Sequence, residues 1–201
     1  MSERGSWASR LFKSAMLRGT SFSDAHGKLK TLYTVEDPWD MASEREQYRF
    51  QETNRQLTEV APHFGHVLEL GCGEGHQTLH LAQIANQISG IELSPKAVAR
   101  AQARCPEGTF RAGQIEAVRT LFPNTRFDLI TGCEVLYYVS DLESVLQSLY
   151  GLTERLYVSN YAPRAARMES ALSGLGWRPL APIHHQDTTW ECRIWEATQA
   201  G

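Results

Sequence analysis

One glycine-rich stretch, from Val67 to Leu79, constrains the fold of this chain more than any other feature. It reads Val-Leu-Glu-Leu-Gly-Cys-Gly-Glu-Gly-His-Gln-Thr-Leu. The apolar residues before the glycines are typical of a buried parallel strand, and the pattern from Gln77 onwards is helical. Gly71, Gly73 and Gly75 allow a sharp turn between them and let a ligand lie against bare backbone. The stretch therefore predicts a strand, a nucleotide-binding loop and a helix.

The spacing of these glycines separates two classes of cofactor. A dinucleotide-binding loop has the pattern G-x-G-x-x-G, and its third glycine would fall on His76. The pattern here is G-x-G-x-G. It disfavours a pyrophosphate, and with it a nicotinamide-dependent oxidoreductase. It favours a cofactor without phosphates, whose adenosine and amino-acid halves straddle the loop.

Two acidic residues support the same interpretation. Glu92 ends a second strand-like run, residues 87–91, at the distance from the glycines where a doubly wound fold places an acid on ribose hydroxyls. A carboxylate at Glu69 would repel a pyrophosphate. The same carboxylate can help to order the loop near the cationic amino acid and sulfonium of S-adenosylmethionine.

Together, Glu-x-Gly-x-Gly-x-Gly, Glu92 and the later strand Phe127-Asp-Leu-Ile resemble class I S-adenosylmethionine-dependent methyltransferases. The N-terminal part resembles the nodulation protein S family, in which Asp-Pro-Trp and a Tyr-Glu-x-x-Lys-like helix precede the glycine loop. Asp37-Pro-Trp and the spacing of Glu46 and Arg49 match, whereas Arg45 stands where the family has tyrosine. The resemblance implies an α/β fold: a doubly wound, mostly parallel, Rossmann-like sheet of seven strands with an N-terminal helical arm.

We expect residues 1–42 to form the arm, as a possible lid, and residues 43–201 to form a single methyltransferase domain. Residues 7–18 have the pattern of a short amphipathic helix, for which packing on the domain is favoured over a transit peptide or a membrane-surface helix. Ser43 and Glu46 have the spacing of a helix capping box. Trp39 either packs on the core or covers the cofactor.

The rest of the chain alternates between strand and helix patterns. Ser94 and Pro95 are typical of a helix start. The last two segments predict a pair of strands, consistent with the antiparallel final strand that distinguishes methyltransferases from dehydrogenases. Strands are expected at 109–112, 127–132, 155–160, 177–184 and 188–197, and helices at 142–150 and 165–175.

The predicted cofactor site combines the glycine loop, the ends of the neighbouring strands and the arm. Gln114 stands where similar methyltransferases commonly have an acid near the adenine. An amide can still donate and accept there, although a solvated loop glutamine is an alternative. The predicted cofactor-binding residues are Trp39, Glu69, Gly71, Cys72, Gly73, Gly75, Glu92, Leu93, Gln114, Ile115, Glu116 and Glu134.

Three residues are predicted to be catalytic: Glu134, Tyr137 and His184. Ligands of an open parallel sheet lie beyond the carboxyl ends of its strands, which places Glu134 and Tyr137 beside the transferable methyl group. We expect one of Tyr137 and Tyr138 to be buried and the other to face the pocket, with Tyr137 preferred for the pocket. His184 could accept a proton from the substrate, or it could cap an exposed hairpin together with His185.

Composition limits the partners. A net charge of −3 gives no electrostatic footprint for nucleic acid or an anionic membrane. No apolar run approaches the length of a membrane span. The four scattered cysteines suggest neither zinc nor disulfides, which favours a reducing, cytoplasmic compartment. His76 and His80 have a metal-ligand spacing but no third ligand, so we expect no metal.

The expected function is an S-adenosylmethionine-dependent methyltransferase that acts on a small molecule. The resemblance implies N-methylation of an amine or amino sugar. O-methylation of a hydroxyl on a secondary metabolite and a non-catalytic cofactor-binding module remain alternatives. The oligomeric state, the acceptor and any catalytic base stay open at this point.

Overall fold

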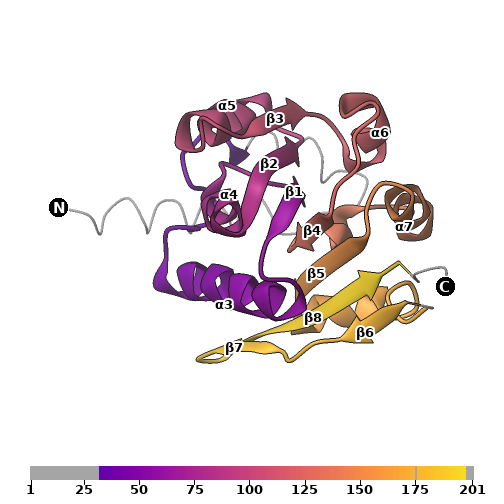
Figure 1. Ribbon diagram of the computed structural model, residues 1–201. Helices are drawn as coiled ribbons and strands as arrows, with labels where there is room; N and C mark the ends of the chain where they lie inside the picture. Colours follow the sequence, from indigo (N-terminus) through magenta and orange to yellow (C-terminus); the bar gives the residue numbers. More distant parts are fainter. Residues whose placement is uncertain (1–31, 175, 198–201) are drawn as a thin grey trace.

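The structure, a computed structural model, describes residues 32–174 and 176–197. The predicted amphipathic helix at residues 7–18 lies outside these residues. The described residues form a single sheet with helices packed against it (Figure 1). None of the helices in this part of the chain is long and apolar enough to cross a membrane.

The sheet has eight strands in the order β3-β2-β1-β4-β5-β8-β6, and β7 also pairs with β8. Strands β1 to β5 are parallel, and β8 runs antiparallel to its three neighbours. The strands are β1 Phe64–Leu70, β2 Ala85–Glu92, β3 Thr109–Ala112, β4 Leu129–Cys133, β5 Arg155–Tyr161, β6 Trp177–Pro179, β7 Ile183–His185 and β8 Thr188–Glu196. This topology confirms the predicted doubly wound, mostly parallel sheet with an antiparallel final strand.

The strand count differs from the predicted seven because the segment expected as one strand, 177–184, is divided into β6 and β7. Pro182 lies in the gap between them, and proline has no N–H to donate to a strand ladder. Both short strands still pair with β8, so the topology of the predicted fold is kept.

Most of the predicted helices are present. The helices are α3 Glu44–Val60, α4 His76–Leu81, α5 Pro95–Arg104, α6 Val118–Leu121, α7 Leu142–Tyr150 and α8 Ala162–Ala165, with short 3₁₀ turns that include Ile115–Ala117, Leu136–Tyr138 and Ala166–Met168. Helix α7 has the predicted bounds. Helix α5 starts as expected, since Ser94 accepts a hydrogen bond from the Ala97 N–H at 3.4 Å.

Two local predictions are wrong. The Ser43 side chain makes no capping hydrogen bond. The Glu46 carboxylate, which a capping box would turn towards the Ser43 N–H, forms a buried ion pair with Arg49 at 2.9 Å, and that N–H donates to the Asp40 carbonyl at 3.0 Å instead. The helix expected at 165–175 lies earlier, as α8 and the turn Ala166–Met168. Its predicted C-terminal half forms turns and bends at residues 169–174.

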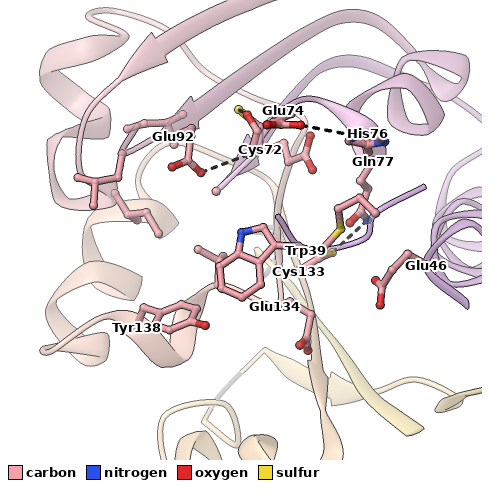
Figure 2. Close-up of a pocket in the computed structure, with 18 of the residues that line it drawn as sticks. Trp39, Glu46, Cys72, Glu74, His76, Gln77, Glu92, Cys133, Glu134 and Tyr138 are labelled. Atoms are coloured by element: carbon pink, nitrogen blue, oxygen red, sulfur yellow. Dashed lines mark hydrogen bonds and ion pairs between the residues drawn. The ribbon is translucent and has the colours of Figure 1, made fainter. Parts of the chain in front are cut away.

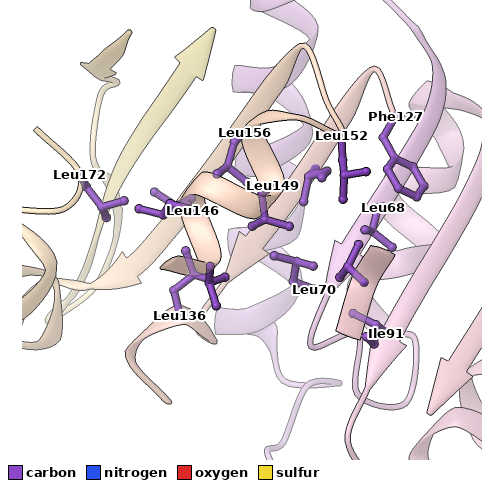
Figure 3. Close-up of a cluster of buried hydrophobic side chains, with 14 of the residues drawn as sticks. Leu68, Leu70, Ile91, Phe127, Leu136, Leu146, Leu149, Leu152, Leu156 and Leu172 are labelled. Atoms are coloured by element: carbon purple, nitrogen blue, oxygen red, sulfur yellow. The ribbon is translucent and has the colours of Figure 1, made fainter. Parts of the chain in front are cut away.

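Two hydrophobic cores hold the sheet, one on each face. Leu68, Leu70 and Ile130 join the core under α7, and Figure 3 shows Leu68 and Leu70 among the leucines of that helix. Their strand neighbours Val67 and Leu129 join the other core, against α3, α4 and α5. Since successive strand residues point to opposite faces, near-continuous apolar strands are what a sheet covered on both sides requires. This packing fixes the carboxyl ends of β1, β2, β4 and β5 at one edge.

Candidate functional site

A cavity of about 320 Å³ lies at that edge (Figure 2). Its walls come from the ends of β1, β2, β4 and β5, from the glycine loop, and from residues 33–50 of the arm and α3. Ligand sites of doubly wound folds occur at this position, beyond the carboxyl ends of the strands. The cavity therefore contains the region that the sequence predicts as the cofactor site.

The glycine loop has the backbone that the sequence predicts. Gly71, Gly73 and Gly75 all have positive φ, at 66°, 52° and 80°. A Cβ atom on Gly71 would lie 2.5 Å from Cγ2 of Val135, so no other residue fits there. Gly71 and Gly73 line the cavity with Cys72 between them. Gly75 is not among the lining residues.

Gly75 serves the packing of the loop instead. A Cβ atom at this position would lie 3.1 Å from Cα of Ala101 on α5. The third glycine therefore lets α4 begin close to α5, and the structure gives it no contact with the cavity. Gly75, predicted to bind the cofactor, therefore affects the cofactor site only by positioning the loop.

Glu92 lies where a ribose-binding acid is expected, at the end of β2. Its side chain is buried and lines the cavity. Its two oxygens accept hydrogen bonds from the backbone N–H groups of Gly73, at 3.2 Å, and Ser94, at 2.9 Å. Burial raises the pKa of this carboxyl, and the backbone hydrogen bonds act in the opposite direction. Glu92 thus joins the glycine loop to the start of α5.

Glu69, at the end of β1, is the second buried carboxyl of the cavity. The hydroxyl of Thr78 donates a hydrogen bond to it. Burial raises the pKa of Glu69 to about 7, although Thr78 and the charge of Arg49 act to lower it. A carboxyl with this pKa titrates near neutral pH, and a cation placed beside it would favour the ionised form.

Arg49 of α3 supplies a buried positive charge on the same cavity. Its guanidinium donates to Glu46 at 2.9 Å and to Gln77 at 3.1 Å, and it lies 4.8 Å from the ring centroid of Phe50. In the sequence, Arg49 is notable only for its spacing from Glu46, which matches a family motif, and it is not predicted to line the cavity. His76 also lines the cavity; its Nε2 makes no hydrogen bond within the described residues and lies 3.9 Å from a carboxylate oxygen of Glu74.

The end of the predicted arm packs against the glycine loop. The Asp37 N–H donates to Glu74 at 2.9 Å, and the Asp37 carboxylate accepts from the Met41 N–H at 2.7 Å. Trp39 lines the cavity and donates from Nε1 to the Tyr33 hydroxyl at 3.2 Å. In the view of Figure 2, Trp39 lies between Glu92 and the side chains at the other end of the cavity.

At that other end, Glu134 is held in a fixed position. It has a positive φ of 58°, and its two carboxylate oxygens accept from the Tyr161 N–H and from the Tyr137 hydroxyl, the latter at 3.1 Å. Burial raises the pKa of Glu134, while Arg49 acts to lower it. Both Tyr137 and Tyr138 line the cavity, and Tyr137 is the more buried of the two. The expected division into one buried and one pocket tyrosine therefore does not hold.

Of the remaining predicted site residues, four line the cavity and one does not. Leu93, Gln114, Ile115 and Glu116 line the cavity beside Glu92. His184 does not: it is exposed on β7, where its Nδ1 lies 2.9 Å from the hydroxyl oxygen of Thr189 across the hairpin. The structure thus supports the alternative in which His184 belongs to the surface hairpin.

Among the cavity residues that sequence reasoning missed are Tyr33, Glu74 and Arg164. Glu74 was visible only as a variable position of the glycine loop, and its buried carboxylate binds Arg100 of α5. Arg164 places its guanidinium carbon 4.4 Å from the ring centroid of Tyr137. Tyr33 and Arg164 belong to no local pattern, because each reaches the cavity through tertiary contacts.

Comparison with known proteins gives a matching family and relatives within it. Residues 21–160 match the Nodulation protein S (NodS) family. The chain is 32% identical to Nodulation protein S of Sinorhizobium fredii over 128 residues, which span 63% of this chain and 59% of that protein, less than two thirds of its length. It is 31% identical to the Azorhizobium caulinodans protein over 143 residues, 70% of this chain and 68% of that one.

A solved structure has a similar fold. The crystal structure of the N-methyltransferase NodS from Bradyrhizobium japonicum, in complex with S-adenosyl-L-homocysteine, superposes with a TM-score of 0.72 at 19% identity. The superposition covers 88% of this chain and 100% of that chain.

Proposed function

The chain belongs to the nodulation protein S family, and from this premise we propose that it is an S-adenosylmethionine-dependent methyltransferase that N-methylates a small-molecule amine or amino sugar. One observation carries the proposal: two buried carboxyls, Glu69 and Glu92, face one cavity together with the bare backbone of Gly71 and Gly73. This arrangement suits an adenosine with a cationic amino-acid part and disfavours a pyrophosphate.

The cavity residues fit the groups of this cofactor. Each Glu92 oxygen holds one backbone N–H and can accept a second hydrogen bond, so Glu92 would bind the ribose hydroxyls. Glu69 would bind the cationic amino group. Arg49 would face the carboxylate, since its buried guanidinium can donate to an anion. Leu93 and Ile115, with the neighbouring polar residues Gln114 and Glu116, would enclose the adenine.

When bound, S-adenosylmethionine supplies a methyl group that its sulfonium already activates. This methyl group is transferred from sulfur to the nitrogen of a neutral amine, which then loses one proton. The chain contributes alignment and exclusion of water, and alignment alone can lower a barrier by about 7 to 11 kcal/mol. Trp39 contributes by covering the cavity. Glu134 would orient the amine and accept its proton. Its position is suited to this because two hydrogen bonds fix the carboxylate before any ligand binds.

An amine acceptor has two supports. One is that the superposed Bradyrhizobium protein is an N-methyltransferase. The other is the aromatic lining of the cavity by Tyr137 and Tyr138, whose ring centroids lie 4.6 Å apart. Aromatic faces stabilise cationic amines and pack on sugar rings.

The test is transfer of a labelled methyl group from S-adenosylmethionine to deacetylated chitooligosaccharides, simple amino sugars and hydroxylated acceptors. We expect label on an amine, with a rate that rises with pH because only the neutral amine reacts. Label on a hydroxylated acceptor but on no amine would replace N-methylation with O-methylation. Cofactor binding without transfer to any acceptor would favour the non-catalytic alternative.

A matched pair of variants locates the chemistry. Glu134→Gln should lower kcat/KM for the amine by about tenfold or more and leave cofactor affinity nearly unchanged. Glu143→Gln is the control, because Glu143 is exposed on α7 and outside the cavity. Equal activity of the two variants would remove Glu134 from the proposed role.

A further inference from the structure

The three arginines that line the cavity differ in their partners. Arg45 and Arg49 both donate to Glu46, at 3.0 and 2.9 Å. Arg164 has no carboxylate within 4.0 Å among residues 32–174 and 176–197. Arg164 is half-buried, so its guanidinium is partly desolvated and an oxyanion in the cavity could pair with it.

The orientation of Arg164 is set by two tyrosines. Helix α8 follows β5 directly, so Arg164 approaches from the carboxyl end of the sheet. Its guanidinium carbon lies 4.4 Å from the ring centroid of Tyr137 and 5.9 Å from that of Tyr138. Nη1 donates to the Tyr138 hydroxyl at 3.4 Å, and within the described residues the other N–H groups of Arg164 make no hydrogen bond. A preoriented planar fork is therefore available to a ligand.

Glu134 is the acidic residue connected most closely to Arg164, and it does not neutralise it by contact. Both oxygens of Glu134 already accept hydrogen bonds, one of them from the Tyr137 hydroxyl. Tyr137 thus contacts both groups, with its hydroxyl on Glu134 and its ring under Arg164. This end of the cavity presents a carboxylate and a guanidinium that are linked through one tyrosine.

We propose that Arg164 binds an anionic group, a carboxylate or a phosphate, on the same acceptor molecule whose amine lies at Glu134. The proposal rests on the proposed methyltransferase function and narrows its substrate class to amines that also carry a negative charge. A guanidinium fork is matched to such oxyanions because it can donate two parallel hydrogen bonds to them. The acceptor would then be held at two points, which orients its amine.

The test uses the full chain saturated with S-adenosylhomocysteine and three ligands that share one ring and one amine. These are glucosamine, glucosamine 6-phosphate and glucosaminuronic acid, which carry a hydroxyl, a phosphate and a carboxylate at the same end. We expect at least one anionic ligand to bind about tenfold more tightly than glucosamine in calorimetric titrations, the effect of one charge-assisted contact. The two anionic ligands show whether phosphate or carboxylate is preferred.

Variants test whether the preference for anionic ligands comes from Arg164. Arg164→Gln should remove the preference, and Arg164→Lys should keep part of it because the charge remains without the fork. Arg167→Gln is the matched control, since Arg167 is exposed in the next turn and outside the cavity. All three variants should bind S-adenosylhomocysteine like the wild type, which shows that they are folded.

Equal binding of the three ligands by the wild type would overturn the proposal, and so would a preference that survives in Arg164→Gln. Failure of the wild type to bind S-adenosylhomocysteine would refute the proposed function itself. Binding of S-adenosylhomocysteine without a preference for anionic ligands would refute only the role of Arg164.

Discussion

Replacing Glu69 by glutamine should remove a loss of stability that the ligand-free protein undergoes as pH rises, and should weaken its binding of S-adenosylmethionine. Glu69 is buried, and burial raises its pKa from 4.5 to about 7. Between these two values the folded protein binds more protons than the unfolded chain, so the free energy of unfolding falls as pH rises through this window. The shift corresponds to a loss of roughly 3 kcal/mol at pH values above the folded pKa.

Glutamine at position 69 cannot ionise, so the variant lacks this loss. Thr78 can donate to the amide oxygen as it does to the carboxylate. The difference in unfolding free energy between variant and wild type should therefore shift by roughly 2.5 kcal/mol in favour of the variant from about pH 5 to about pH 8. A constant cost of the unpaired amide N–H₂ cancels in this comparison.

Urea unfolding of both proteins at the two pH values measures this shift directly. Calorimetry at the higher pH should show that the variant binds S-adenosylmethionine more weakly by about 1.5 to 3 kcal/mol, the worth of a hydrogen bond to a charged group. A pH dependence of stability that is the same in both proteins would refute the account of Glu69. Unchanged cofactor affinity would refute its assignment to the cationic amino group.

Two further variants test other parts of the cavity. Glu92→Ala should weaken cofactor binding by about 1.5 to 3 kcal/mol, because charge-assisted hydrogen bonds to the ribose are lost; calorimetry that finds the wild-type affinity in a folded variant would show that Glu92 is not the ribose acid. Trp39→Ala should lower cofactor affinity or turnover more than it lowers the melting temperature of the ligand-free protein. A loss of stability as large as the loss of affinity would instead make Trp39 a purely structural residue of the arm.

The sequence predicts the fold and the glycine side of the site well because their signals are local. The spacing from Gly71 to Gly75 and the acid at Glu92 lie within one strand–loop–helix–strand segment, where Gly73 donates its N–H to Glu92. The contacts that require Gly71 and Gly75, with Val135 and Ala101, come from later in the chain and are not visible in the pattern. The split of the strand predicted at 177–184 depends on Pro182, which is visible in the sequence. The sequence does not show that the two short strands on either side of Pro182, β6 and β7, would both pair with β8.

The other side of the site could not be predicted in the same way. Arg49 reaches the cavity because a long buried side chain on α3 meets Gln77 of α4, a contact between residues 28 positions apart. Arg164 stacks on Tyr137 from a different element. His184 shows the opposite case: its predicted position at a strand end on the substrate side suggested a base, whereas the pairing of β7 with β8 places it on the surface.

The most direct test of the central claim, that this cavity binds S-adenosylmethionine rather than a dinucleotide, is calorimetric titration of the full chain with S-adenosylhomocysteine and, separately, with NAD⁺. We expect saturable one-site binding of S-adenosylhomocysteine and no binding of NAD⁺, since Glu69 and Glu92 face the ligand at the glycine loop. Saturable binding of NAD⁺, or the absence of any heat with S-adenosylhomocysteine, would contradict it.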